Sequence, residues 1–290
     1  MKNYVIVTES TADLPQDLAD ELGITIIPMV FGFENESYLN YPDNREMDIH
    51  KFYERVKKGE RSTTALINSK TFEEKFEPIL KTGNDILYIG FSSGLSGTYN
   101  ASLIAAEELK QKYPDSRIVC IDTLAASMGE GLLVYHAAKL KQQGQDMERV
   151  SRWLMDNRLK LCQWFTVDDL NHLKRGGRIN AMTATIGSAL NVKPILHVDN
   201  EGYLIPVHNV RGRKKSINSL LEHMEELCIN PEEQTIFISH ADCFEDTENF
   251  ANLIKEKLNV KEVIINFIGP VIGSHTGQGA IALFFIGKER

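Results

Sequence analysis

The sequence predicts an α/β protein of two domains, an N-terminal α/β domain with a mostly parallel sheet over residues 1–160 and a C-terminal α+β domain over residues 161–290. In the first half, short β-branched runs alternate with helix-like segments, an order typical of βαβ units and parallel sheets. In the second half, the runs 195–198 and 203–210 flank the turn sequence DNEG, which is typical of an antiparallel hairpin.

The elements of the first half follow from local patterns. The run YVIVT (4–8) has the uniform apolarity of a buried strand, and Pro15 stands at a helix position that tolerates proline. The same reasoning predicts strands over 4–8, 24–33, 85–91 and 117–122, and helices over 15–22, 98–111 and 127–143.

The second half has a different order of elements. Residues 167–173 are predicted to form a short helix that Gly176 and Gly177 end, and a further helix is expected over 181–191, ahead of Pro194. After the hairpin, helices are expected over 213–228 and 246–258, and strands over 235–241, 263–269 and 280–287.

Composition narrows the class of protein. Forty acidic against 32 basic residues give a net charge of −8, which disfavours general nucleic-acid binding. No apolar run approaches the roughly 20 residues that span a bilayer, and the N-terminus lacks a signal-peptide pattern. The four cysteines form no Cys-x-x-Cys pair, and SHADC (239–243) has no second cluster to complete a metal set. We therefore expect a cytoplasmic protein without a metal or other cofactor.

Hydroxyl-rich loops follow three strands of the first half, over 8–13, 91–98 and 122–127. Ligands of open parallel sheets bind at the carboxyl ends of strands, where these loops lie. Helix capping explains Asp13 and Ser127, but one helix start does not need Ser92, Ser93 and Ser96 together. Thr63 and Thr64 are expected in a further loop, TTAL (63–66), just before a helix that contains Phe72, and a capping role explains them as well as a binding role does.

Two later segments add candidate binding residues. His275 lies in GSHTGQGA (273–280), which we expect to be a flexible loop that could present the imidazole to a ligand. Arg175 and Arg178 flank the double glycine of LNHLKRGGRI (170–179), where a guanidinium could bind a carboxylate or a phosphate.

Known catalytic motifs do not fit these segments. Gly94-Leu95-Ser96-Gly97-Thr98 has threonine where a nucleophile elbow has its last glycine, and no phosphate loop is present. One alternative is an acyl hydrolase or transferase that uses Ser96 or Ser93 with His275. Another alternative is a nucleotide- or sugar-phosphate-binding enzyme of the doubly wound class.

Taken together, the segments resemble the DegV family of fatty-acid-binding proteins. The resemblance rests on ESTADLP, STTAL, SSGLSGTYNAS, LNHLKRGGRI, VRGRKK and GSHTGQGAIAL, which occur in this order over nearly the whole chain. The sequence departs from the family pattern at Glu9, where aspartate is usual, at Ala65 and Leu66 after Thr64, and at Gln278, where proline is frequent.

The resemblance implies that a long-chain fatty acid binds between the two domains. It further implies a carrier, not itself an enzyme, that presents the acyl carboxylate to a separate fatty acid kinase for acyl-phosphate formation. Hydroxyl and imidazole groups suit this role, because a buried carboxylate needs hydrogen-bond donors. By resemblance, Thr64, Ser96 and His275 hold the carboxylate with Ser93 and Thr63 as neighbours, and Arg175 or Arg178 serves the kinase or the phosphoryl group.

Overall fold

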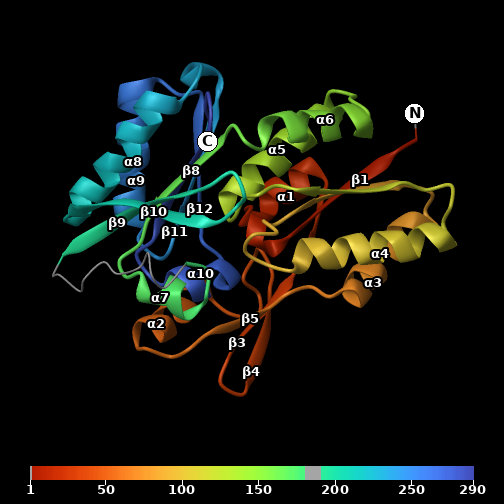
Figure 1. Cartoon of the computed structure of the whole chain (residues 1–290), viewed down its shortest axis with the longest axis horizontal. Coiled ribbons are helices and arrows are strands. Elements are labelled where there is room, and N and C mark those ends of the chain that lie inside the picture. The colour runs from red at the N-terminus through yellow and green to blue at the C-terminus, as the bar shows by residue number, and fades with distance from the viewer. Residues whose placement is uncertain (1, 180–190) are drawn as a thin grey trace.

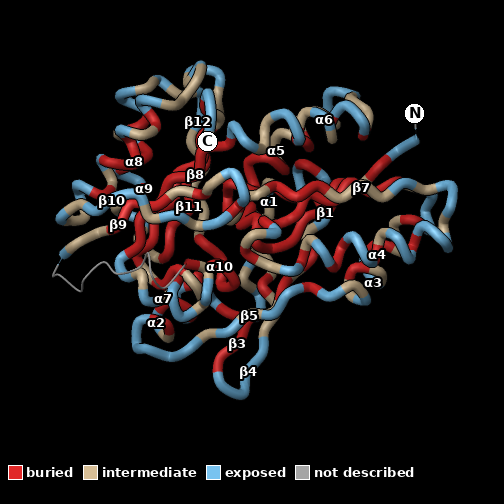
Figure 2. Tube along the Cα trace, viewed as in Figure 1, coloured by how far each residue is buried: buried red, intermediate tan, exposed pale blue. Residues whose placement is uncertain are grey.

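The computed structural model describes residues 2–179 and 191–290 (Figure 1). The helix expected over residues 181–191 therefore lies, but for its last residue, outside the described part of the chain. The remaining elements form two principal sheets and one small sheet. Figure 2 shows that the most deeply buried backbone runs through the strands of the two principal sheets.

The first principal sheet is fully parallel, as the sequence predicts, with the strand order β2-β1-β6-β7. Two groups of helices lie on opposite sides of it in Figure 1, α3 with α4 and α1 with α5 and α6. The strands are β1 (Tyr4–Glu9), β2 (Ile24–Ile27), β6 (Asp85–Gly90) and β7 (Ile118–Asp122). The helices are α1 (Gln16–Leu22), α3 (Ser69–Lys81), α4 (Thr98–Lys112), α5 (Met128–Gln142) and α6 (Met147–Asn157).

The small sheet corrects the expectation of one strand over residues 24–33. Pro28 separates β2 from β3 (Met29–Phe33), because proline has no N–H to continue a ladder. Strand β3 pairs instead with β4 (Glu36–Asn40) and β5 (Thr63–Ala65), which places Thr64 in a strand and not in a loop. Helix α2 (Ile49–Lys57) lies between β4 and β5 in the chain.

The second principal sheet is mixed and has the strand order β10-β9-β8-β13-β11-β12. Only β11 and β12 pair in parallel, and β9 and β10 form the predicted antiparallel hairpin. Helices α8 (Arg213–Leu227) and α9 (Phe244–Leu258) pack on it. The strands are β8 (Leu161–Thr166), β9 (Val192–Val198), β10 (Leu204–Arg211), β11 (Thr235–His240), β12 (Glu262–Phe267) and β13 (Ile281–Ile286).

Strand β13 shows how the second sheet divides its two faces. Ile281, Leu283 and Phe285 belong to the apolar cluster that packs with α8 and α9. Ala282 and Phe284 alternate with them and join the larger cluster that the first sheet shares. Helix α5 contacts strands of both principal sheets. The first sheet ends with β7 and the second begins at Leu161, and we propose the domain boundary near residue 160 on this basis.

Three buried carboxyl groups lie near the carboxyl ends of the first sheet's strands. Glu130 on α5 accepts hydrogen bonds from Thr8 Oγ1 (2.8 Å) and Thr11 Oγ1 (3.1 Å). Burial raises the pKa of Glu130 well above its usual range, and it raises the pKa of Glu9 to about 7 and the pKa of Asp13 to about 8. The folded state therefore favours the protonated form of each of these three carboxyl groups.

We expect the free energy of unfolding to fall as the pH rises from about 7.5 to about 8.5, because deprotonation of the buried carboxyl groups costs more in the folded state. The stabilisation from the protonated carboxyl groups is complete below the ordinary carboxyl pKa, and it is lost as the pH rises through their raised folded-state pKa values. The buried histidines have lowered pKa values in the folded state and the ordinary value of about 6.5 in the unfolded state, so their opposing contribution is nearly complete above about pH 7.5. Glu130→Gln should flatten the dependence in denaturant unfolding, whereas Glu54→Gln, at an exposed position, should not. Parallel curves for Glu130→Gln and the parent would contradict this account.

Candidate ligand-binding site

A cavity of about 470 Å³ lies between the two principal sheets. Its volume falls in the usual range of small-molecule sites. Apolar side chains from both halves of the chain form most of its wall: Met29, Leu66, Phe91, Leu95, Phe165, Leu173, Val198, Leu204, Ile268, Val271, Ile272 and Phe284, with four alanines among them. Such a wall suits an apolar ligand several carbons long.

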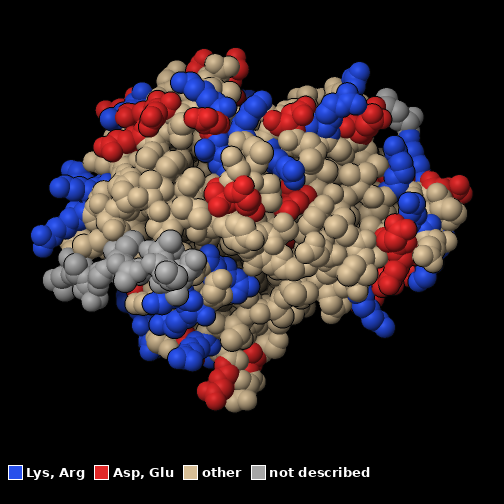
Figure 3. All heavy atoms as spheres, viewed as in Figure 1, with Lys and Arg blue, Asp and Glu red and all other residues tan. Residues whose placement is uncertain are grey.

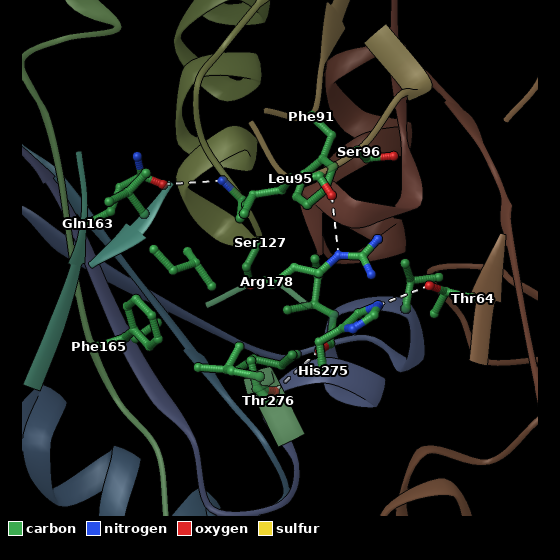
Figure 4. Close-up of a pocket in the computed structure, with 18 of the residues that line it drawn as sticks. Thr64, Phe91, Leu95, Ser96, Ser127, Gln163, Phe165, Arg178, His275 and Thr276 are labelled. Atoms are coloured by element: carbon green, nitrogen blue, oxygen red, sulfur yellow. Dashed lines mark hydrogen bonds between the residues drawn. The ribbon is translucent and has the colours of Figure 1, made fainter. Parts of the chain in front are cut away.

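Thr64 and His275 form a polar pair at one part of this wall. Their Oγ1 and Nε2 atoms lie 2.9 Å apart, and Figure 4 shows the two side chains pointing toward one another. The other ring nitrogen, Nδ1, is buried and has no hydrogen-bond partner among the described residues. Burial, assisted by the nearby charge of Arg178, lowers the pKa of His275 to about 4. The imidazole is therefore neutral at pH 7 when no ligand is bound.

The expected loop around His275 is instead a helix. Helix α10 (Pro270–Thr276) places His275 in its last turn, and the backbone leaves the helix at Gly277, where φ is +73°. Thr276 follows His275 and also lines the cavity, although it is not among the binding residues predicted from the sequence. The histidine is thus held by a regular element.

The serines of the loop after β6 have different positions. Ser93 and Ser96 line the cavity, whereas Ser92 is fully buried and donates a hydrogen bond to the Gly202 carbonyl oxygen (2.8 Å). Ser96 Oγ lies 2.9 Å from Thr98 Oγ1 and accepts a hydrogen bond from the Thr98 N–H (3.2 Å). Ser96 can therefore serve both the first turn of α4 and a ligand.

A second cavity, of about 820 Å³, adjoins the first. Thr64, Arg178 and His275 line both cavities, so the polar pair stands where the two spaces meet. Thr63 and Arg175 line only the second cavity. The remaining side chains of its wall are largely polar: Lys57, Glu60, Arg61, Ser62, Asp169, His172 and Ser274, beside Val56.

The two candidate arginines differ in their surroundings. Arg178 is half-buried, and its Nε donates a hydrogen bond to the Leu95 carbonyl oxygen (3.3 Å); burial lowers the pKa of its guanidinium. Arg175 ends α7 (Asn171–Arg175), is exposed, and lies 3.2 Å through Nη2 from His172 Nδ1. The glycine turn between them thus sends one arginine to the cavity and the other outward.

The expectation that the Asp13 and Ser127 side chains cap the helices that follow them is wrong, although Ser127 does occupy the N-cap position of α5. Pro15 is the N-cap of α1, and Asp13 is buried with a φ of +49°. Ser127 precedes α5, but its Oγ donates to Asp13 Oδ2 (2.6 Å) and also lines the first cavity.

Gln163 lines the first cavity too, and its Oε1 accepts a hydrogen bond from the Ala126 N–H (3.2 Å). Gln163 stands two residues before Phe165 in β8, so the two side chains share one face of the strand, and this spacing is the sequence signal that could have identified Gln163.

The geometry does not assemble a serine hydrolase site. Within the described residues, no hydrogen bond joins His275 to Ser93 or Ser96, because its Nε2 faces Thr64. Its unpaired Nδ1 has no group to orient the ring, as a catalytic triad requires. The described residues also contain no group of three or more side chains suited to a metal ion, and none of their helices is long and apolar enough to cross a membrane.

Gly176 lies directly against the His275 ring, where a larger residue would not fit. A Cβ built at Gly176 would come too close to His275 Nδ1, although the φ of −71° is open to any residue. We expect Gly176→Ala to displace the imidazole and to shift its NMR signals. Gly177→Ala is the control, because its φ is +69° but no atom lies within 4 Å of its Cβ. That variant should lose about 1–2 kcal/mol of stability and leave the His275 signals in place. Unchanged His275 signals in Gly176→Ala would show that the added methyl group fits without displacing the ring.

Comparisons with known proteins agree along almost the whole chain. A family model described as "Uncharacterised protein, DegV family" matches residues 3–288. A DegV domain-containing protein of Clostridium perfringens is 48% identical over 290 residues, which cover 100% of this chain and 99% of that one. A structure described as "Fatty Acid Binding of a DegV family Protein from Thermus thermophilus" has a TM-score of 0.89 and 29% identity, and covers 99% of this chain and 100% of that one. The structure of "DegV, a fatty acid binding protein from Bacillus subtilis" has a TM-score of 0.85 and 31% identity, with coverage of 99% and 100%.

Proposed function

Because the chain belongs to the DegV family, we propose that it binds one long-chain fatty acid in the 470 Å³ cavity. The observation that carries this proposal is the cavity itself, which is apolar along its wall and has the Thr64–His275 pair at its junction with the second cavity. The acyl chain would occupy the apolar part, and the carboxylate would meet the polar pair.

The polar groups at this junction suit a carboxylate. The Ser96 hydroxyl can donate one hydrogen bond to a carboxylate oxygen. The Thr64–His275 pair can donate one when the ring is neutral and two when the ring is protonated, because one proton joins the two side chains. Arg178 adds a positive charge beside His275, Ser93 lines the first cavity, and Thr63 lines the second. Hydrogen bonds to a charged group offset part of the cost of removing it from water.

The acyl chain would supply most of the affinity. Burial of each CH₂ group contributes about 0.8 kcal/mol, so a long chain gains far more than the few polar contacts. Since only the carboxylate end needs hydrogen-bond donors, the asymmetric wall also fixes the direction in which the chain lies. The methyl end would point away from the junction, into the apolar part of the cavity.

We further propose that the protein is a carrier that presents the carboxylate to a separate fatty acid kinase for acyl-phosphate formation. The second cavity leads outward from the proposed carboxylate position and is lined by Lys57, Arg61 and Arg175. Figure 3 shows Lys and Arg side chains gathered over α2 and α7, although the whole chain is acidic. A basic opening would favour a phosphoryl group or an acidic surface of the kinase. All four cysteines are free thiols, which supports action in the cytoplasm.

Native mass spectrometry of the purified protein, followed by organic extraction, tests the binding. The expected result is one fatty acid per chain in the parent and none in Ala282→Trp, whose added ring would fill the apolar part of the cavity. Because overpacking can also unfold a protein, circular dichroism of the variant accompanies the measurement. A parent that carries no fatty acid and takes up none when it is added would refute the proposed function.

A further inference from the structure

Helix α10 is held at its N-terminus by side chains from the other half of the molecule. The first N–H groups of a helix have no partner within it. Here the Gly269 N–H donates to Asp13 Oδ1 (2.9 Å) and the Val271 N–H donates to Asn40 Oδ1 (3.3 Å). Pro270, between them, has no N–H to satisfy. Two distant residues therefore act as caps that the local sequence lacks.

Asp13 joins three segments at this point. Its Oδ2 accepts the hydrogen bond from Ser127 at the start of α5, and its carbonyl oxygen accepts one from Asn266 Nδ2 (2.7 Å). A Cβ built at Gly269 would lie only 2.6 Å from Asp13 Oδ1, so the backbone must be glycine there for the carboxyl to reach it. The contact is thus a close fit between buried groups.

The small sheet connects the two ends of α10. Asn40 ends β4 and pairs with Met29 of β3, whereas Thr64 on β5 pairs with Phe31 of the same strand. The sheet therefore bonds the start of α10 through Asn40 and its last turn through the Thr64–His275 pair. Since the helix has only seven residues, a change at its start moves its end.

We propose that Asp13 and Asn40 are positioning residues for carboxylate binding, which cap helix α10 from outside and so hold His275 against Thr64. This inference rests on the proposed function. It assigns to Asp13, the second of two acidic residues in the ESTAD segment, a role in ligand recognition, although its side chain does not line the 470 Å³ cavity.

The proposal predicts a loss that is specific to the carboxylate. In Asp13→Ala and Asn40→Ala, the affinity for a long-chain fatty acid should fall about 3- to 30-fold, the range expected for loss of a helix cap. The affinity for the fatty alcohol of the same chain length should change less than about twofold, because the apolar wall is intact. Asp13→Asn and Asn40→Asp keep the accepting Oδ1 and should restore binding of the acid. Asparagine also tolerates the positive φ at position 13.

Asp85→Ala is the matched control, because Asp85 is buried at the opposite end of the first sheet and accepts the Arg117 N–H (2.9 Å). It should lower stability without separating the affinities for acid and alcohol. NMR signals of the His275 ring in ligand-free protein give a second measurement, and they should shift in both cap variants but not in Asp85→Ala. Each cap variant tests the proposal independently if the other does not fold. Equal loss for acid and alcohol, or unmoved His275 signals, would overturn it. A parent that binds neither ligand would instead refute the proposed function.

Discussion

Replacement of His275 by alanine should lower the affinity for a long-chain fatty acid about 10- to 100-fold. The estimate follows from the roughly 1.5–3 kcal/mol that a hydrogen bond to a charged group contributes. The ring bonds only Thr64, and its Nδ1 has no partner among the described residues, so its removal leaves little unsatisfied. Titration with a fluorescent fatty acid measures the affinity, and thermal unfolding shows whether the variant remains folded.

Ser96→Ala extends this test to the loop after β6. It should also weaken binding, but by a smaller factor, because Ser96 already bonds Thr98 and so offers the ligand only part of its capacity. Ser92→Ala is its control, since Ser92 does not line the cavity and bonds the Gly202 carbonyl. If His275→Ala and Ser96→Ala both bind as tightly as the parent, the carboxylate lies elsewhere.

The second large effect separates the two arginines. Arg178→Ala should lower fatty-acid affinity at least about tenfold, because it removes a half-buried charge at the proposed carboxylate position. Arg175→Ala should leave affinity within about twofold and yet abolish ATP-dependent acyl-phosphate formation with the cognate kinase. The Arg175 side chain is exposed and, of the two cavities, lines only the second. This assigns the role toward the kinase, which the resemblance leaves open between Arg175 and Arg178, to Arg175 alone.

Fatty-acid affinity and acyl-phosphate formation should both be measured on the same variant proteins. Lys174→Ala is the control, because Lys174 directly precedes Arg175 in the chain, is exposed and lines neither cavity. If affinity and phosphorylation fall together in Arg175→Ala, that arginine is a ligand anchor. If neither quantity changes in Arg175→Ala, its proposed role toward the kinase is wrong.

The parallel sheet could be predicted because its determinants are local. The runs 4–8, 85–91 and 117–122 carry their own apolar pattern, and hydroxyl-rich loops follow them directly. The small sheet could not be predicted, because β5 has only three residues and gains its ladder from β3, about 30 positions earlier. Thr64 therefore looked like a loop residue.

The position of His275 shows the same limit within the site. GSHTGQGA has the composition of a loop, and the helix that precedes Gly277 is capped by Asp13 and Asn40, far away in the chain. The separation of Arg175 from Arg178 depends on the φ of +69° at Gly177. Residue types thus identified candidates for the site, whereas long-range contacts decided which of them line the cavity.

A crystal structure with a long-chain fatty acid tests the central claim most directly. We predict one acyl chain along the apolar wall, with its carboxylate within hydrogen-bond distance of Thr64 Oγ1 and His275. The cavity also has polar groups away from this pair, at Ser127 and Gln163 (Figure 4). Ser127 is already bonded to Asp13, and Gln163 to the Ala126 N–H. A carboxylate at Ser127 and Gln163, or a cavity that remains without ligand at saturating fatty acid, would contradict the account.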